Sequence, residues 1–173
     1  MDVDAGQFAS AGTPVVAYVD RSSFRVDGYF QETKLRRDKS MQATKQADRC
    51  GWRAVFGPAM ATCELGTSGG TAARARKGLG LVPNARAKDG YEHRISGAWV
   101  QCILRGGVHC FSVYMKDGDG AGETNQAIRA ELAAILGAVR GPWIVGGDWN
   151  MTPEVLARSG WPTVVKGKVA APD

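Results

Sequence analysis

The spacing of apolar residues predicts helices in two parts of the chain. From Glu123 to Val139 apolar side chains recur every three or four positions, which is the spacing of one helix face. Gly141 and Pro142 follow directly and are expected to end this helix. The segment from Lys39 to Cys50 lacks Gly and Pro and spaces its apolar residues in the same way, so it is expected to form a surface helix.

Shorter apolar or alternating runs, bounded by Gly, Pro or Asn, predict strands. They are Val15–Val19, Phe24–Phe30, Trp52–Phe56, Thr71–Arg76, Ile95–Leu104 and Val108–Tyr114. A further run, Trp143–Gly147, follows the longer helix and shows no polar alternation, which is typical of a strand buried on both faces. A helix that leads into a buried strand indicates an α/β fold.

Length and composition fit one folded domain. The chain has 173 residues, 44% of them hydrophobic, and its mean hydropathy is −0.22. No apolar run approaches the roughly 18 residues that a membrane span needs. Met1–Gln7 contains no Lys or Arg, unlike a secretory signal. We therefore expect an intracellular protein that does not bind membranes, with nucleus and cytoplasm left open.

The net charge of +5 adds a preference for polyanions. Basic residues concentrate in two segments, 34–49 and 74–88. These segments could line a phosphate-binding groove or form two solvated faces, and the sequence leaves both interpretations open.

Two candidate site residues, Asp148 and Asn150, follow the glycines that end the apolar run Trp143–Gly147. Side chains at the ends of strands commonly reach a ligand-binding crevice. If the extended backbone continues, residues two apart point to the same side, so Asp148 and Asn150 would converge on one ligand. The alternative is an Asx turn that caps the next helix around Glu154.

A second candidate, Glu32, follows the apolar residues Tyr29 and Phe30. A carboxylate at a strand end is a suitable ligand for Mg²⁺, which is typically held by one or two protein carboxylates. The alternative is a surface glutamate paired with Lys34 or Arg36.

Taken in order, these segments resemble the endonuclease/exonuclease/phosphatase superfamily, which includes DNase-I-like nucleases, apurinic endonucleases and the endonuclease domains of retroelements. The resemblance runs from about residue 24 to about residue 153. Its motifs are Gln31-Glu32-Thr33-Lys34, Gly51-Trp52, Gly57-Pro58, Gly69-Gly70-Thr71-Ala72, Arg76-Lys77-Gly78, Tyr114 and Gly147-Asp148-Trp149-Asn150.

This resemblance implies a four-layer α/β/β/α sandwich and Mg²⁺- or Mn²⁺-dependent phosphodiester hydrolysis on nucleic acid, with DNA as the expected substrate. Glu32 would hold the metal, Asp148 would orient or deprotonate the attacking water, and Asn150 and Tyr114 would hydrogen-bond the scissile phosphate. Further substrate contacts are expected from Lys34, Arg76 and Lys77. A phosphatase or lipid phosphodiesterase of the same superfamily is the alternative.

Two family features do not match. The family's opening Asn-x-Asn strand has no counterpart in Met1–Gln7, and no Ser-Asp-His sequence follows Asn150. We therefore expect residues 1–173 to form a single domain whose C-terminal part is missing, with a tail of uncertain structure at 161–173. The chain would then be weakly active, or a non-catalytic relic that only binds polyanions.

The remaining aromatic and imidazole side chains are given structural roles. His109 is expected to pack or lie at the surface, and no motif surrounds His93. The tryptophans in or beside predicted strands are expected to lie mostly in the core: Trp52, Trp99, Trp143 and Trp149. For Trp149 the alternative is a position facing substrate.

Overall fold

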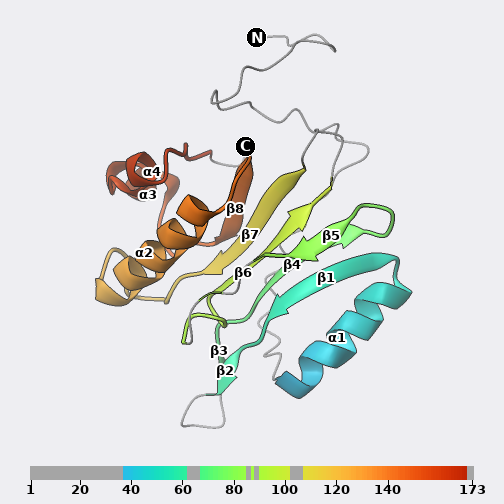
Figure 1. Ribbon diagram of the computed structural model, residues 1–173. Coiled ribbons are helices and arrows are strands. Elements are labelled where there is room, and N and C mark those ends of the chain that lie inside the picture. The colour runs from blue at the N-terminus through green and yellow to red at the C-terminus, as the bar shows by residue number, and fades with distance from the viewer. Residues whose placement is uncertain (1–36, 62–66, 85–86, 88–89, 102–106, 171–173) are drawn as a thin grey trace, which may run out of the picture.

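The computed structural model describes residues 37–61, 67–84, 87, 90–101 and 107–170 (Figure 1). The predicted strands Val15–Val19 and Phe24–Phe30 lie outside these residues, as do Glu32 and Lys34.

The described residues contain both helices and strands. The helices are α1 (Arg37–Arg49), α2 (Glu123–Ala138), α3 (Pro153–Arg158) and α4 (Trp161–Val164). The strands are β1 (Trp52–Gly57), β2 (Met60–Ala61), β3 (Thr67–Ser68), β4 (Thr71–Arg76), β5 (Leu81–Pro83), β6 (Ile95–Val100), β7 (Val108–Tyr114) and β8 (Trp143–Asp148). Both predicted helices in this part of the chain are confirmed, and an α/β class is correct.

The largest sheet has the strand order β5-β6-β7-β8. Neighbouring strands are antiparallel except β7 and β8, which run parallel and are connected through α2. Parallel neighbours require such a crossover, because the chain must return to the starting end of the sheet. The crossover brings the carboxyl ends of β7 and β8 to the same edge.

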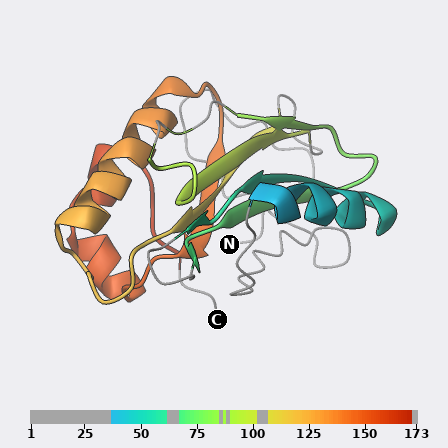
Figure 2. The same cartoon turned by 90° about the horizontal axis from the view of Figure 1, so that it is seen from below.

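Helix α2 covers one face of this sheet (Figures 1 and 2). Its apolar stripe supplies Ile128, Leu132 and Leu136, which pack with Phe111 and Val113 of β7. Ile128 and Leu132 are almost completely buried, and each buried side chain of this size contributes about 1.5 to 3 kcal/mol relative to exposure. This core fixes β7 and β8 relative to each other.

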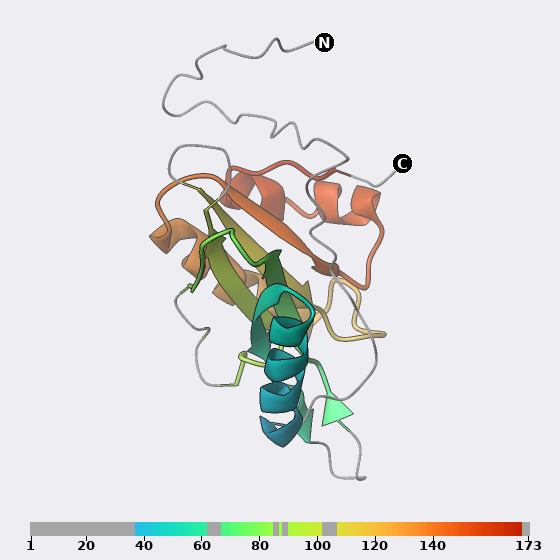
Figure 3. The same cartoon turned by 90° about the vertical axis from the view of Figure 1, so that its right-hand side faces the viewer.

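The opposite face of the sheet packs against the antiparallel pair β1–β4. Small and medium-sized residues fill this layer, with Ala75 of β4 against Val100, Val108 and Cys110. Helix α1 packs against β1 on the far side from α2 (Figure 3). The described part of the chain is therefore layered as α1, the β1–β4 pair, the β5–β8 sheet and α2.

Strand β8 differs from its prediction. It ends the strand order of the described sheet, and its burial alternates, with Ile144 46% exposed. Trp143 and Val145 pack against the α2 core instead. Burial on both faces is therefore wrong for this strand, because the described residues cover only its α2 side. The run of apolar residues without alternation did not distinguish an edge strand from a central one.

Candidate active site

Tyr114 and Asp148 lie at the last paired positions of the parallel strands β7 and β8, where they are Cα partners. Side chains alternate along a strand, and aligned residues of neighbouring strands share a face. Val113 packs into the α2 core, so Tyr114 and Asp148 are on the face turned toward the β1–β4 layer. The structure thus brings two of the predicted site residues together.

The chain turns sharply after Asp148. Asn150 has a left-handed backbone (φ 46°), and its N–H donates to Asp148 Oδ1 at 3.0 Å. Of the two interpretations that the sequence left open, the extended backbone does not continue and the Asx turn forms. It does not cap α3, however: Thr152 does so, with its Oγ1 accepting from the N–H of Val155.

The Asn150 side chain ties this turn back to β7. Its Nδ2 donates to the carbonyl oxygen of Met115 at 2.7 Å, while the N–H of Met115 donates to the carbonyl oxygen of Asp148. Asn150 is consequently held beside both Tyr114 and Asp148. One Nδ2 hydrogen is used by Met115, and among the described residues the second has no acceptor.

The oxygen chemistry of the turn suits a hard cation. Within the described ranges, no hydrogen bond is made to Asp148 Oδ2 or Asn150 Oδ1, and such oxygens are the ligands that Mg²⁺ prefers. The same residues contain no group of three or more His, Cys, Asp and Glu side chains that could hold a metal by themselves. The predicted metal ligand, Glu32, lies outside them.

Gly147 makes the close approach of β8 to β7 possible. Its φ is 151°, and a Cβ at this position would overlap the backbone of Val113. A Cβ at the neighbouring Gly146 would meet nothing within 4 Å. Gly146 would thus tolerate a side chain, whereas Gly147 must be glycine, just before the turn at Asp148.

The residue that sequence reasoning missed is Arg94, which directly precedes β6. Its side chain is only 8% exposed, and its Cζ lies 5.2 Å from the centre of the Tyr114 ring. Nη2 donates to Ser68 Oγ at 3.0 Å, and the Arg94 carbonyl accepts from the N–H of Tyr114. Burial lowers the pKa of Arg94, although the nearby Tyr114 opposes this effect. The sequence signal that could have identified Arg94 is its position directly before the predicted strand that begins at Ile95.

The Gly69-Gly70 turn supports the loop that carries Arg94. The N–H of Gly70 donates to the His93 carbonyl at 2.7 Å, and a Cβ at Gly69 would approach that carbonyl to 2.5 Å. His93 is 8% exposed, and its pKa is lowered by burial first and by the adjacent Arg94 second. The Gly69-Gly70 turn therefore packs against the loop that places Arg94 at the site.

Arg76 and Lys77 are not brought to this site. Arg76 ends β4, and Lys77 follows it in the next turn. At about 3.3 Å per residue, Arg76 is roughly 17 Å along the strand from Thr71, the first residue of β4. The Arg76 guanidinium lies 4.6 Å from the centre of the Trp52 ring, and Lys77 Nζ forms an ion pair of 2.9 Å with Asp48. Both residues belong to a separate basic surface.

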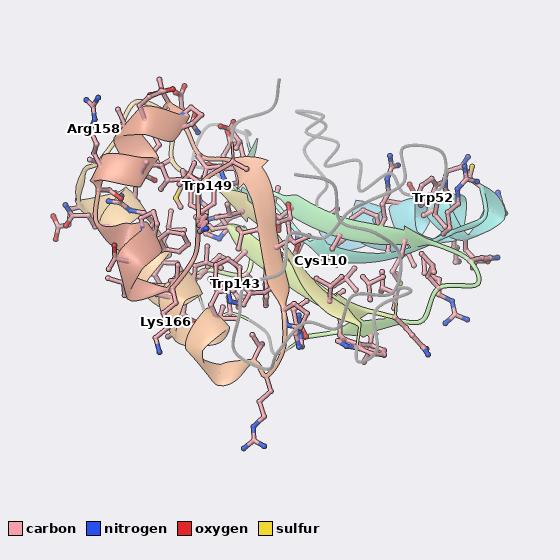
Figure 4. The ribbon with its side chains drawn as sticks, turned by 90° about the horizontal axis from the view of Figure 1, so that it is seen from above. Trp52, Cys110, Trp143, Trp149, Arg158 and Lys166 are labelled. Atoms are coloured by element: carbon pink, nitrogen blue, oxygen red, sulfur yellow. The ribbon has the colours of Figure 1, made fainter. Side chains whose placement is uncertain are left out.

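Tryptophan placement is mixed (Figure 4). Trp143 and Trp149 pack on the α2 core as predicted, and Trp149 makes an edge contact with Trp161 of α4. Trp52 lies on the α1 side of the molecule under the guanidiniums of Arg74 and Arg76, so a core position is wrong for it.

His109 has the structural role expected of it. Its Nδ1 lies 2.9 Å from Asn84 Oδ1, and its Nε2 lies 3.2 Å from the carbonyl oxygen of Arg140. Both ring nitrogens thus lie within hydrogen-bond distance of an oxygen from a neighbouring loop, and whichever carries the hydrogen donates to it.

Comparison with known proteins gives no family assignment. No family model matches the chain, and no curated protein matches it. Among the described helices, none is long and apolar enough to cross a membrane.

Proposed function

We propose that this protein hydrolyses phosphodiester bonds in nucleic acid with the help of a divalent cation, using Asp148, Asn150 and Tyr114. The observation that carries the proposal is the pairing of Tyr114 with Asp148 at the carboxyl edge of two parallel strands, with Asn150 fixed beside them. A carboxylate, a phenol and an amide gathered at one strand edge supply the acceptor and donors that ester hydrolysis needs.

Each group has a distinct task in this proposal. Asp148 accepts a proton from the attacking water or orients it, since Oδ1 is held by the N–H of Asn150 and Oδ2 is left for water. The Tyr114 hydroxyl and the second Nδ2 hydrogen of Asn150 donate to the phosphoryl oxygens. Glu32 would hold Mg²⁺ or Mn²⁺, and the cation would supply positive charge to stabilise the phosphoryl oxygens.

The layer order supports the finer architecture that we propose, a partial four-layer sandwich of the DNase-I-like type. Two packed sheets lie between α1 and α2 in the described residues. In such an arrangement the two sheets pack face to face, and each has one face turned toward the other. The Tyr114–Asp148 pair lies on an inward face.

Nucleic acid is favoured over a small ester by the basic surface formed by Arg74, Arg76 and Trp52. Two guanidiniums lie over one indole ring, at 4.8 and 4.6 Å from its centre. Guanidiniums contact phosphates, and aromatic rings stack on bases, so this combination suits a polynucleotide.

Nicking of supercoiled plasmid in Mg²⁺ or in EDTA tests the proposal. We expect slow nicking that EDTA abolishes and that Asp148→Asn lowers by about 10²–10³. The asparagine keeps an Oδ1 acceptor for the N–H of Asn150, so the turn is preserved. Glu123→Gln, which removes the same charge from the exposed first turn of α2, is the control. Nicking that persists undiminished in Asp148→Asn would exclude this site.

A further inference from the structure

Arg94, Tyr114 and Asp148 form a row across three neighbouring strands. Ile95 is the register partner of Val113, and the N–H of Tyr114 donates to the Arg94 carbonyl at 2.9 Å, so the pairing continues one residue further. Tyr114 is in turn the partner of Asp148. At a strand spacing of about 4.8 Å, the row places a cation and a carboxylate on opposite sides of one phenol.

The Arg94 guanidinium is buried without an anionic partner among the described residues. Nη2 is used by Ser68, and Nη1 has no hydrogen-bond partner in that part of the chain. A buried charge lacking compensation is destabilising, and the cost is removed when an anion binds.

Two hydroxyls nearby are also unused. Thr71 Oγ1 is buried, and no hydrogen bond to it is found within the described residues. It lies beside the loop that carries Arg94, because a Cβ built on Gly57 would contact both Thr71 Oγ1 and the carbonyl oxygen of Glu92. Ser96 Oγ, two positions along β6 from Arg94 and on the same face, has no partner there either.

We propose that Arg94, assisted by the Thr71 hydroxyl, binds an oxygen of a phosphate group that lies over Tyr114. This inference rests on the proposed function and adds an oxyanion-binding group to it. The guanidinium presents several N–H donors in a fixed plane, which matches the oxygens of a phosphate. Tyr114 then lies between the group that binds the phosphate and the carboxylate that handles the water.

Inorganic phosphate is the probe, titrated by calorimetry at constant ionic strength. We expect Arg94→Lys to weaken phosphate binding by about 10-fold, because the planar donor pair is lost. Thr71→Val should weaken binding several-fold while leaving thermal stability unchanged or raised, since the hydroxyl makes no hydrogen bond within the described residues.

Arg129→Lys is the matched control. Arg129 is also buried, at 6% exposure, and its Nη1 has no partner in the described ranges, but it belongs to α2 on the other side of the sheet. Phosphate binding should be unchanged in this variant. Equal phosphate affinity in the wild type, Arg94→Lys and Thr71→Val would overturn the inference, even if Arg94→Lys slows nicking.

The two proposals fail separately. If plasmid nicking depends on Asp148 while phosphate binding is indifferent to Arg94 and Thr71, the proposed function stands and the oxyanion site is wrong. If phosphate binding depends on Arg94 and Thr71 but no Asp148-dependent nicking is found, the anion site stands and hydrolysis is wrong. Thr71→Val keeps the test decisive if Arg94→Lys does not fold.

Discussion

Tyr114 and Asp148 occupy paired positions on two parallel strands although the whole of α2 separates them in the chain. Their backbones are therefore held at the strand spacing of about 4.8 Å by hydrogen bonds and not by side-chain contact. Substitution of either side chain should remove a chemical group without changing the positions of the others. The backbone thus positions the site, while the side chains supply its chemistry.

Gly147→Ala should be strongly destabilising. Its added methyl would overlap the Val113 backbone, and its φ of 151° is unfavourable for any other residue, so we expect a loss of about 2 to 4 kcal/mol in the free energy of unfolding. Gly146→Ala is the control, because its methyl meets no atom within 4 Å. Urea denaturation measures both, and equal stability of the two variants would contradict the described approach of β8 to β7.

Asn150→Ala should cost more stability than Asn150→Gly. Both variants lose the hydrogen bond to the Met115 carbonyl, which contributes about 1 kcal/mol to the free energy of unfolding. In the alanine variant the left-handed backbone lowers that free energy by about 1 kcal/mol more. Thermal unfolding monitored by tryptophan fluorescence gives the order. If glycine were the worse substitution, the backbone conformation assigned to Asn150 would be incorrect.

His93 should make the protein less stable in mild acid. Because its pKa is lowered in the folded state, the unfolded state binds the proton first, and stability falls as the pH drops below about 6.5 toward the folded pKa. Unfolding free energies at pH 7.5, 6.5 and 5.5 test this. The decline should be smaller in His93→Gln and should remain in His109→Gln, where His93 is still present. An identical decline in wild type and His93→Gln would assign the effect to other groups.

Binding to nucleic acid should be salt-dependent and insensitive to sequence. Phosphate contacts release counterions, so the affinity for a labelled duplex should fall steeply between 50 and 200 mM salt, an interval over which about 10³-fold is lost for six contacts. Arg76→Gln should reduce the slope of this dependence by about one. An affinity that does not change with salt would exclude the Arg74–Trp52–Arg76 surface as a polynucleotide contact.

Much of the fold followed from sequence periodicity. The three- and four-residue spacing of α2 reflects a helix with one buried face, and the strands of β4 and β7 were correctly bounded by turn residues. The burial of β8 was not predictable, because an apolar run describes what a strand can bury and not whether a neighbour covers it.

The site was only partly predictable for a similar reason. Tyr114, Asp148 and Asn150 occupy motif positions that local sequence can reveal. Arg94 takes its place through the register of β6 with β7 and through the reach of its side chain to Ser68, both of which are tertiary. Arg76 lies on the same strand as Thr71 but at its other end, and Lys77 follows in the turn after that strand.

The consecutive order of β7, α2 and β8 also has a consequence for how the site assembles during folding. Tyr114, Asp148 and Asn150 belong to one β–α–β unit, and the parallel strands can pair only once the helix has returned the chain to the same edge. The amide hydrogen of Met115, which is bonded to the carbonyl oxygen of Asp148, should then exchange with solvent through the same opening that releases α2. Truncation of the buried Leu132 would lower the population of assembled sites without touching any reacting group.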